Sequence, residues 1–187
     1  MYDRIKTALL RFADLSDNQL SEVINRLQRH EVAKGNILFK EGQICRHFYF
    51  IDSGCFRQCM TMESGVEATL NLWVDGEWMF DHKSFISQQP AIAHIEAADD
   101  SLVFTLGGHD FHELVKISDI FFRLGSIMED GVKNNDYQHN RLSPEEKYEL
   151  LLAKRPELIQ RFPLKHIASY LGMTPETLSR VRKKISS

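Results

Sequence analysis

The stretch FPLKHIASYLGMTPETLSRVRKKI, residues 162–185, predicts two short helices joined by a tight turn. Gly172 is placed to end the first helix, and Thr174 is placed to cap a second helix that has Pro175 at its first position. The small side chain of Ala168 lets the two helices approach closely. Apolar residues recur at helical spacing in both halves: Leu164, Ile167 and Leu171, then Leu178, Val181 and Ile185. This pattern is typical of a helix-turn-helix.

The second of these helices exposes residue types that bind DNA. Side chains near its N-terminus can reach base edges in the major groove, whereas Lys and Arg further along meet phosphate. Arg180 is the candidate for a bidentate contact with guanine, and Glu176 can accept from the amino group of cytosine. The predicted DNA-binding residues are Thr174, Glu176, Thr177, Ser179, Arg180, Arg182 and Lys183. The alternative is an ordinary helical hairpin with a solvated basic face.

The distribution of charge favours the DNA-binding interpretation. Residues 1–140 carry 13 Lys or Arg and 21 Asp or Glu, whereas residues 141–187 carry 10 and 5. The net charge of −3 therefore hides an acidic body and a basic C-terminal segment. Such an asymmetry indicates that only the C-terminal segment meets a polyanion.

Residues 31–106 change from helical spacing to short apolar runs separated by Gly or Asp turns. The runs ILF, HFYFI and TLNLWV each end at such a turn. Regularly spaced short strands of this kind indicate an antiparallel sandwich or barrel. A helix at residues 16–29, with Ser16 as its cap, is predicted before them.

Helical spacing returns after the strands. Apolar residues alternately three and four apart form an a/d pattern about two heptads long: Leu114, Ile117, Phe121, Leu124 and Met128. We predict that these side chains form a dimer interface between two copies of the chain. An amphipathic helix that packs only on its own β-domain is the alternative.

Together these patterns predict an α+β chain in three parts. Residues 1–110 form an N-terminal antiparallel β-domain with a preceding helix. Residues 111–140 form a long dimerisation helix, and residues 141–187 form an all-α helix-turn-helix domain.

Nearly the whole chain resembles the Crp/Fnr-type bacterial transcription regulators. The resemblance is carried by KGNILFKEGQICRHFYFIDSGCFR at residues 34–57 and by the E-x-x-S-R pattern of Glu176, Ser179 and Arg180. It implies a cyclic-nucleotide-binding-like β-roll as sensor domain. It also implies a homodimer that binds an inverted repeat in double-stranded DNA, with RNA polymerase as a further partner, in the bacterial cytoplasm.

The effector region departs from the pattern of this family. Cyclic-nucleotide binders in it carry Gly-Glu-Leu or Gly-Glu-Ile, followed further along by Arg-Ser or Arg-Thr. Here Gly76, Glu77 and Trp78 keep the first half, whereas Ala91 and Ile92 stand where Arg and Ser would be. A phosphate there would lack its cationic partner, so cyclic AMP is not expected to bind in the usual manner. The predicted effector pocket comprises Glu77, Trp78, Ala91 and Ile92, with Glu77 interpreted as a structural turn residue.

The cysteines and histidines predict neither a cofactor nor a metal site. The odd count of three cysteines, Cys45, Cys55 and Cys59, favours a reducing compartment, and Cys55 and Cys59 are interpreted as structural thiols. No cysteine precedes Cys45, so the N-terminal iron–sulfur cluster of the oxygen-sensing branch is not expected. His109 and His112 lie three residues apart, but no third ligand is in view.

The sequence also excludes several function classes. It contains no Gly-rich phosphate loop, nucleophile elbow, zinc motif or catalytic acid pair, so no enzymatic activity and no catalytic residue is predicted. It contains no run of ~18 apolar residues and no secretory signal. We therefore predict a homodimeric, sequence-specific transcriptional regulator that does not depend on cyclic AMP. The alternative is a β-roll dimer that binds a protein or senses a ligand without binding DNA.

Overall fold

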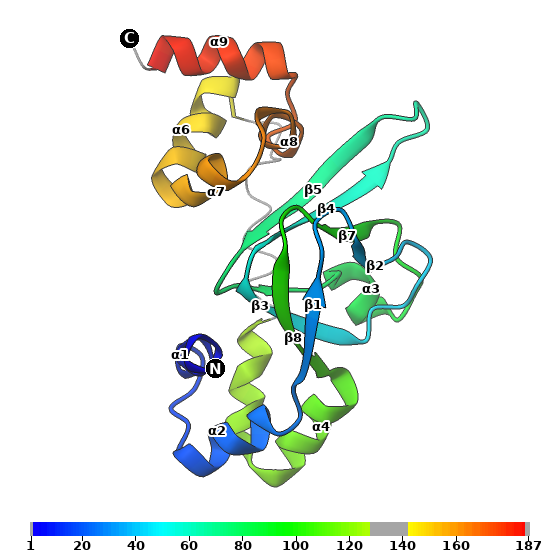
Figure 1. The fold of residues 1–187 in the computed structure, drawn as a ribbon, viewed down its shortest axis with the longest axis vertical. Coiled ribbons are helices and arrows are strands. Elements are labelled where there is room, and N and C mark those ends of the chain that lie inside the picture. The colour runs from blue at the N-terminus through cyan, green and yellow to red at the C-terminus, as the bar shows by residue number, and fades with distance from the viewer. Residues whose placement is uncertain (1, 128–141, 186–187) are drawn as a thin grey trace.

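The structure, a computed structural model, describes residues 2–127 and 142–185 (Figure 1). A β-roll occupies the middle of the molecule in Figure 1, with the N-terminal helices at one end and the C-terminal helices at the other. Met128, the last residue of the predicted dimer interface, lies outside the described residues.

Two antiparallel sheets form the β-roll. Within the described residues, one sheet has the strand order β1-β8-β3-β6 and the other β2-β7-β4-β5. The strands are β1 (Gln28–Val32), β2 (Ile37–Phe39), β3 (His47–Ser53), β4 (Cys55–Thr61), β5 (Glu67–Val74), β6 (Trp78–Met79), β7 (His94–Ala97) and β8 (Ser101–Gly107). The predicted antiparallel β-domain is confirmed.

The turn between β3 and β4 shows why glycine separates the apolar runs. Gly54 has a φ of +101°, a conformation that L-residues with a Cβ rarely adopt. A Cβ at this position would also collide with Ser101 at the start of β8. Only glycine therefore lets the chain reverse here while β8 stays paired with β3.

Helices surround the roll and form the C-terminal domain. They are α1 (Asp3–Leu10), α2 (Asp17–Ile24), α3 (His82–Ser87), α4 (Gly108–Ile117), the 3-10 helix η1 (Asp119–Gly125), α6 (Pro144–Lys154), α7 (Pro156–Arg161), α8 (Leu164–Tyr170) and α9 (Pro175–Ile185). Ser16 caps α2 as predicted, and Ser143 forms a second capping box with Glu146 at the start of α6. No helix within these described ranges is long and apolar enough to cross a membrane.

The predicted dimer seam is wrong for most of its described members. Leu114, Phe121 and Leu124 are fully buried in the core of their own chain, so they cannot form an interface with a second copy. The helix also breaks: α4 ends at Ile117, Ser118 is extended, and η1 follows. The alternative holds here, because a helix packed on its own sheets shows the same apolar spacing as a dimer seam.

The C-terminal helices do not form a core by themselves. Cys55, Leu72 and Val74 of the β-roll belong to the same apolar cluster as the buried residues of α6 to α9. The helical domain is therefore packed directly against the sheet that contains β4 and β5 (Figure 1).

Candidate DNA-binding helix and effector cavity

The helix-turn-helix is built from α8 and α9. Gly172 sits between them with a φ of +69°, and the Met173 amide donates to the Ala168 carbonyl over 2.9 Å. Ala168 is completely buried, as its predicted role in close helix approach requires. The ammonium group of Lys147, on α6, donates to the Leu171 carbonyl over 3.0 Å. The turn is thus closed by a Schellman-like bond and by a cation at the C-terminus of α8.

The start of α9 is capped as the sequence predicts. The Thr177 amide donates to the Thr174 hydroxyl over 3.2 Å. A backbone amide at the helix start and the Thr174 hydroxyl lower the pKa of Glu176, which keeps this carboxylate charged at neutral pH. The Arg180 guanidinium lies 3.4 Å from the Thr177 hydroxyl.

The predicted DNA-binding side chains lie on the outer face of α9. Leu178 and Val181 are buried beneath them against the rest of the domain. Thr177 is half-buried, whereas the other predicted residues are exposed: Thr174, Glu176, Ser179, Arg180, Arg182 and Lys183. An exposed helix with acceptors at its first turn and cations further along has the chemistry needed to enter a major groove.

The helical domain is held on the β-roll by an ion pair. Arg155, at the start of α7, makes two 2.7 Å bonds to the carboxylate of Glu77 and a 3.2 Å bond to the Leu72 carbonyl. The Thr69 amide on β5 donates to the Ser169 hydroxyl on α8 over 2.9 Å. Burial raises the pKa of Glu77, and the neighbouring Arg155 opposes this effect.

Two of the four predicted effector residues, Glu77 and Trp78, make structural contacts and do not line the cavity that contains Ala91 and Ile92. Glu77 binds Arg155, and it also accepts from the Val74 amide over 2.8 Å. Trp78 is buried on β6, where its ring centroid lies 5.2 Å from that of Phe50. Their assignment to an effector pocket is therefore corrected, because both side chains are used in packing and domain contact.

The other two, Ala91 and Ile92, line a cavity of about 440 Å³ over α3. Its remaining lining residues come from β4, β5, α3 and the loops on either side of α3: Gln58, Leu70, Asn71, Phe80, Asp81, His82, Lys83, Ser84, Ser87, Gln89, Pro90 and Ala93. Lys83 on α3 also lines this cavity, so a cation is present there although Ala91 and Ile92 supply none.

Sequence reasoning missed Asp81, which organises this cavity. Its carboxylate caps α3 by accepting from the Ser84 amide over 2.8 Å. It also accepts from the Gln58 side chain over 2.7 Å, which ties α3 to β4. The sequence does contain a signal for this role, because an Asp three residues before Ser84 is typical of the cap at a helix start.

The fold and the site define the class of protein: an antiparallel β-roll with a cavity, joined to a helix-turn-helix. Residues 29–118 match the cyclic nucleotide-binding domain family. The solved structure of FixK2 from Bradyrhizobium japonicum has a TM-score of 0.69 over 86% of this chain and 84% of its own, with 16% identity. At that identity, the likeness establishes the fold.

Two curated relatives match over most of their length. The cyclic AMP receptor protein of Thermus thermophilus is 26% identical over 178 residues, which cover 91% of this chain and 82% of the relative. The fumarate and nitrate reduction regulatory protein of Yersinia pestis is 26% identical over 184 residues, covering 89% and 72%. The chain thus contains a cyclic nucleotide-binding-type domain and matches the Crp/Fnr regulators, which confirms the resemblance.

Proposed function

We propose that the protein is a sequence-specific DNA-binding transcriptional regulator. The observation that carries the proposal is the outer face of α9, where Glu176, Ser179 and Arg180 are exposed beside one another. Arg180 can form a bidentate contact with guanine, and Glu176 can accept from cytosine. Arg182 and Lys183, further along the helix, are placed for phosphate. The protein acts by binding and not by catalysis.

The regulator acts as a homodimer on an inverted repeat. Two copies would present two α9 helices to successive major grooves, ~34 Å apart. The buried residues of the predicted interface cannot pair the copies, but one other member, Ile117, is exposed, and so is the neighbouring Phe122. Ile117 on α4 is 54% exposed and Phe122 on η1 is 74% exposed. A second copy that covers them would remove an apolar surface from water.

The effector is not cyclic AMP bound in the family's usual manner. Ala91 and Ile92 offer no donor side chain to a phosphate, and the described cavity lining contains no arginine. Lys83 contributes a point charge without the planar, two-pronged geometry of a guanidinium. A small, mostly apolar effector suits this lining. Its binding would act on α9 through the β-roll. The regulator works in the cytoplasm, with RNA polymerase as a further partner.

Selection from a random pool of DNA duplexes tests the proposal. The ligand-free full chain at near-physiological salt should enrich an inverted repeat with two identical half-sites. Affinity for the enriched site should fall steeply with salt, because bound phosphates release counterions. A protein that enriches no sequence, and whose binding to DNA is equally weak for all duplexes, would instead be the protein-binding β-roll dimer.

A further inference from the structure

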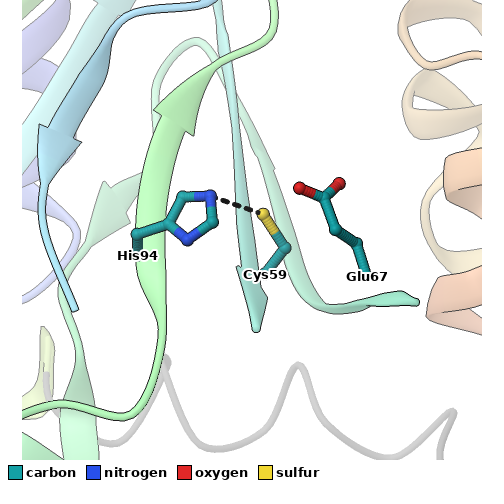
Figure 2. Close-up of side chains that lie close together, drawn as sticks. All are labelled: Cys59, Glu67 and His94. Atoms are coloured by element: carbon teal, nitrogen blue, oxygen red, sulfur yellow. Dashed lines mark hydrogen bonds between the residues drawn. The ribbon is translucent and has the colours of Figure 1, made fainter. Parts of the chain in front are cut away.

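A cysteine, a histidine and a glutamate from three strands meet on one face of the second sheet (Figure 2). Cys59 on β4 and His94 on β7 are direct partners in the strand register. Their Sγ and Nε2 atoms lie 3.1 Å apart. Glu67, at the start of β5, points its carboxylate toward this pair, and the three ligand atoms all lie within 4.8 Å of one another.

The donor set has the chemistry of a transition-metal site. Thiolate, imidazole and carboxylate are the three ligand types found around zinc in proteins. A tetrahedral ion with ordinary zinc–sulfur and zinc–nitrogen bonds separates these two atoms by about 3.6 Å. The observed 3.1 Å between Cys59 and His94 is close to that separation, so small side-chain rotations bring both atoms to coordination distance.

Arg57 holds two carboxylates in place, that of Glu67 in the cluster and that of the neighbouring Glu96. It donates to Glu67 over 2.7 Å and to Glu96 over 2.8 Å, and leaves the other oxygen of Glu67 available. A Cys59 thiolate and these two carboxylates would leave net negative charge after Arg57 is counted. A divalent cation neutralises that excess.

Two buried polar atoms beside the cluster have no hydrogen-bond partner among the described residues. One is the hydroxyl of Thr69, the register partner of Cys59 on β5. The other is Nδ1 of His166, which belongs to α8. His166 is not one of the three residues whose ligand atoms lie within 4.8 Å of one another. Buried polar atoms are rarely left without a hydrogen-bond partner, so we expect a further partner for these atoms at this place.

We propose that Cys59, His94 and Glu67 bind a divalent transition-metal ion of the zinc type. The site lies on the sheet against which α8, the helix that precedes the DNA-binding helix α9, is packed. It revises the interpretation of Cys59 as a purely structural thiol.

Binding exchanges a proton for the metal. The Cys59 Sγ–H bond breaks, the sulfur lone pair forms the bond to the cation, and the proton leaves to solvent; no electron is transferred. Burial raises the pKa of the Cys59 thiol to about 12, and Arg57 partly offsets this. The free protein therefore holds the neutral thiol, and the Nε2 lone pair of His94 stays available for the ion.

The ion would fix Glu67 on β5, two residues before Thr69, whose amide donates to Ser169 on α8. Metal binding would then bias how α9 is presented. This regulatory consequence rests on the proposed DNA-binding function, whereas the metal site itself does not.

Titration of the metal-free full chain with Co²⁺ and Zn²⁺ tests the site directly. One Co²⁺ per chain should bind and produce a thiolate-to-cobalt charge-transfer band, which one equivalent of Zn²⁺ then abolishes. Cys59→Ser should lose the band, and Glu67→Gln, at a half-exposed position that tolerates change, should weaken affinity tenfold or more. Cys55→Ser is the matched control, because Cys55 is equally buried on β4 but lies outside the cluster.

His94→Gln should also weaken Co²⁺ affinity about tenfold or more. Unchanged affinity in that variant would overturn His94 as a ligand. Absence of stoichiometric binding by the wild-type chain, or an unchanged band in Cys59→Ser, would overturn the site. Circular dichroism confirms that each variant is folded. These readouts involve no DNA, so they separate failure of the metal site from failure of the proposed function, which the duplex selection tests.

Discussion

At the scale of single residues, Arg180 carries the largest share of the proposed sequence preference. Its side chain is exposed on α9 and lies near the Thr177 hydroxyl, so its guanidinium is already directed along the outer face. Neighbouring Lys183 has a different role in the proposal, since a single ammonium group binds phosphate without reading a base.

Replacing Arg180 with Ala should cost about 1–3 kcal/mol of binding free energy and relax one position in each half-site. Lys183→Ala should instead weaken binding to all sequences alike and reduce the salt slope by about one. Competition binding with single-base variants of the selected site, at several salt concentrations, measures both effects. Intact sequence preference in Arg180→Ala would show that another side chain reads the base.

We predict that titration of the Cys45 thiol lowers the free energy of unfolding in alkaline solution. Burial raises its pKa from 9.0 to about 11. The pKa of Cys45 is higher in the folded state than in the unfolded state. The contribution of this thiol to the free energy of unfolding is therefore complete below pH 9 and is lost as the pH rises toward 11. The loss amounts to roughly 3 kcal/mol for this group.

Urea unfolding at pH 8 and at pH 10.5 measures this effect. Cys45→Ala should lose less stability than the wild type between the two pH values, whatever its stability at pH 8. Parallel losses in the two proteins would show that the Cys45 thiol is not the titrating group.

At the scale of elements, the helix-turn-helix depends on one backbone conformation. Gly172 has a φ of +69°, and a Cβ there would meet nothing closer than the Lys147 ammonium at 3.7 Å. Gly172→Ala should therefore cost only the strain of a left-handed residue, about 1–2 kcal/mol. Gly54→Ala should cost more, because its Cβ also collides with Ser101. Equal losses in urea unfolding would contradict this distinction.

The same scale explains what the sequence can predict. The cap at Thr174, the glycine turn and the small Ala168 are local signals, and each keeps its role in the structure. The a/d spacing of Leu114 and Phe121 misleads because any partner, including the chain's own sheets, imposes the same period.

Contacts between distant segments had no local signal. Cys59 and His94 meet only because β4 pairs with β7, which the spacing of cysteines cannot reveal. Likewise, the motif Gly76-Glu77 placed Glu77 in the predicted effector pocket, and nothing near it in the sequence indicated its partner, Arg155. The cavity forms further along the chain, where Asp81 starts α3.

At the scale of the whole molecule, the ion pair between Glu77 and Arg155 joins the helical domain to the β-roll. Glu77→Gln should leave the nearly buried Arg155 guanidinium without its charge partner, at a cost of a few kcal/mol. The Thr69 amide, which donates to Ser169 across the same interface, should then exchange its hydrogen faster. Glu31→Gln, which breaks an exposed pair with Arg29, is the control and should leave that exchange unchanged.

Self-association should depend on the exposed apolar residues of α4 and η1. Phe122→Ser should shift the sedimentation of the chain from dimer toward monomer. Ile86→Ser removes an apolar side chain of similar exposure on α3 and should leave the dimer intact. A dimer that survives Phe122→Ser unchanged would place the interface elsewhere.

The apolar cluster that unites Cys55, Leu72 and Val74 with the C-terminal helices has a calorimetric consequence. Neither part can melt without exposing apolar surface of the other, so the chain should absorb heat in one cooperative transition. Separating the β-roll from the C-terminal helices as two fragments would expose an apolar surface on each fragment. The two domains are therefore expected to unfold together, and the border between them does not act as a hinge.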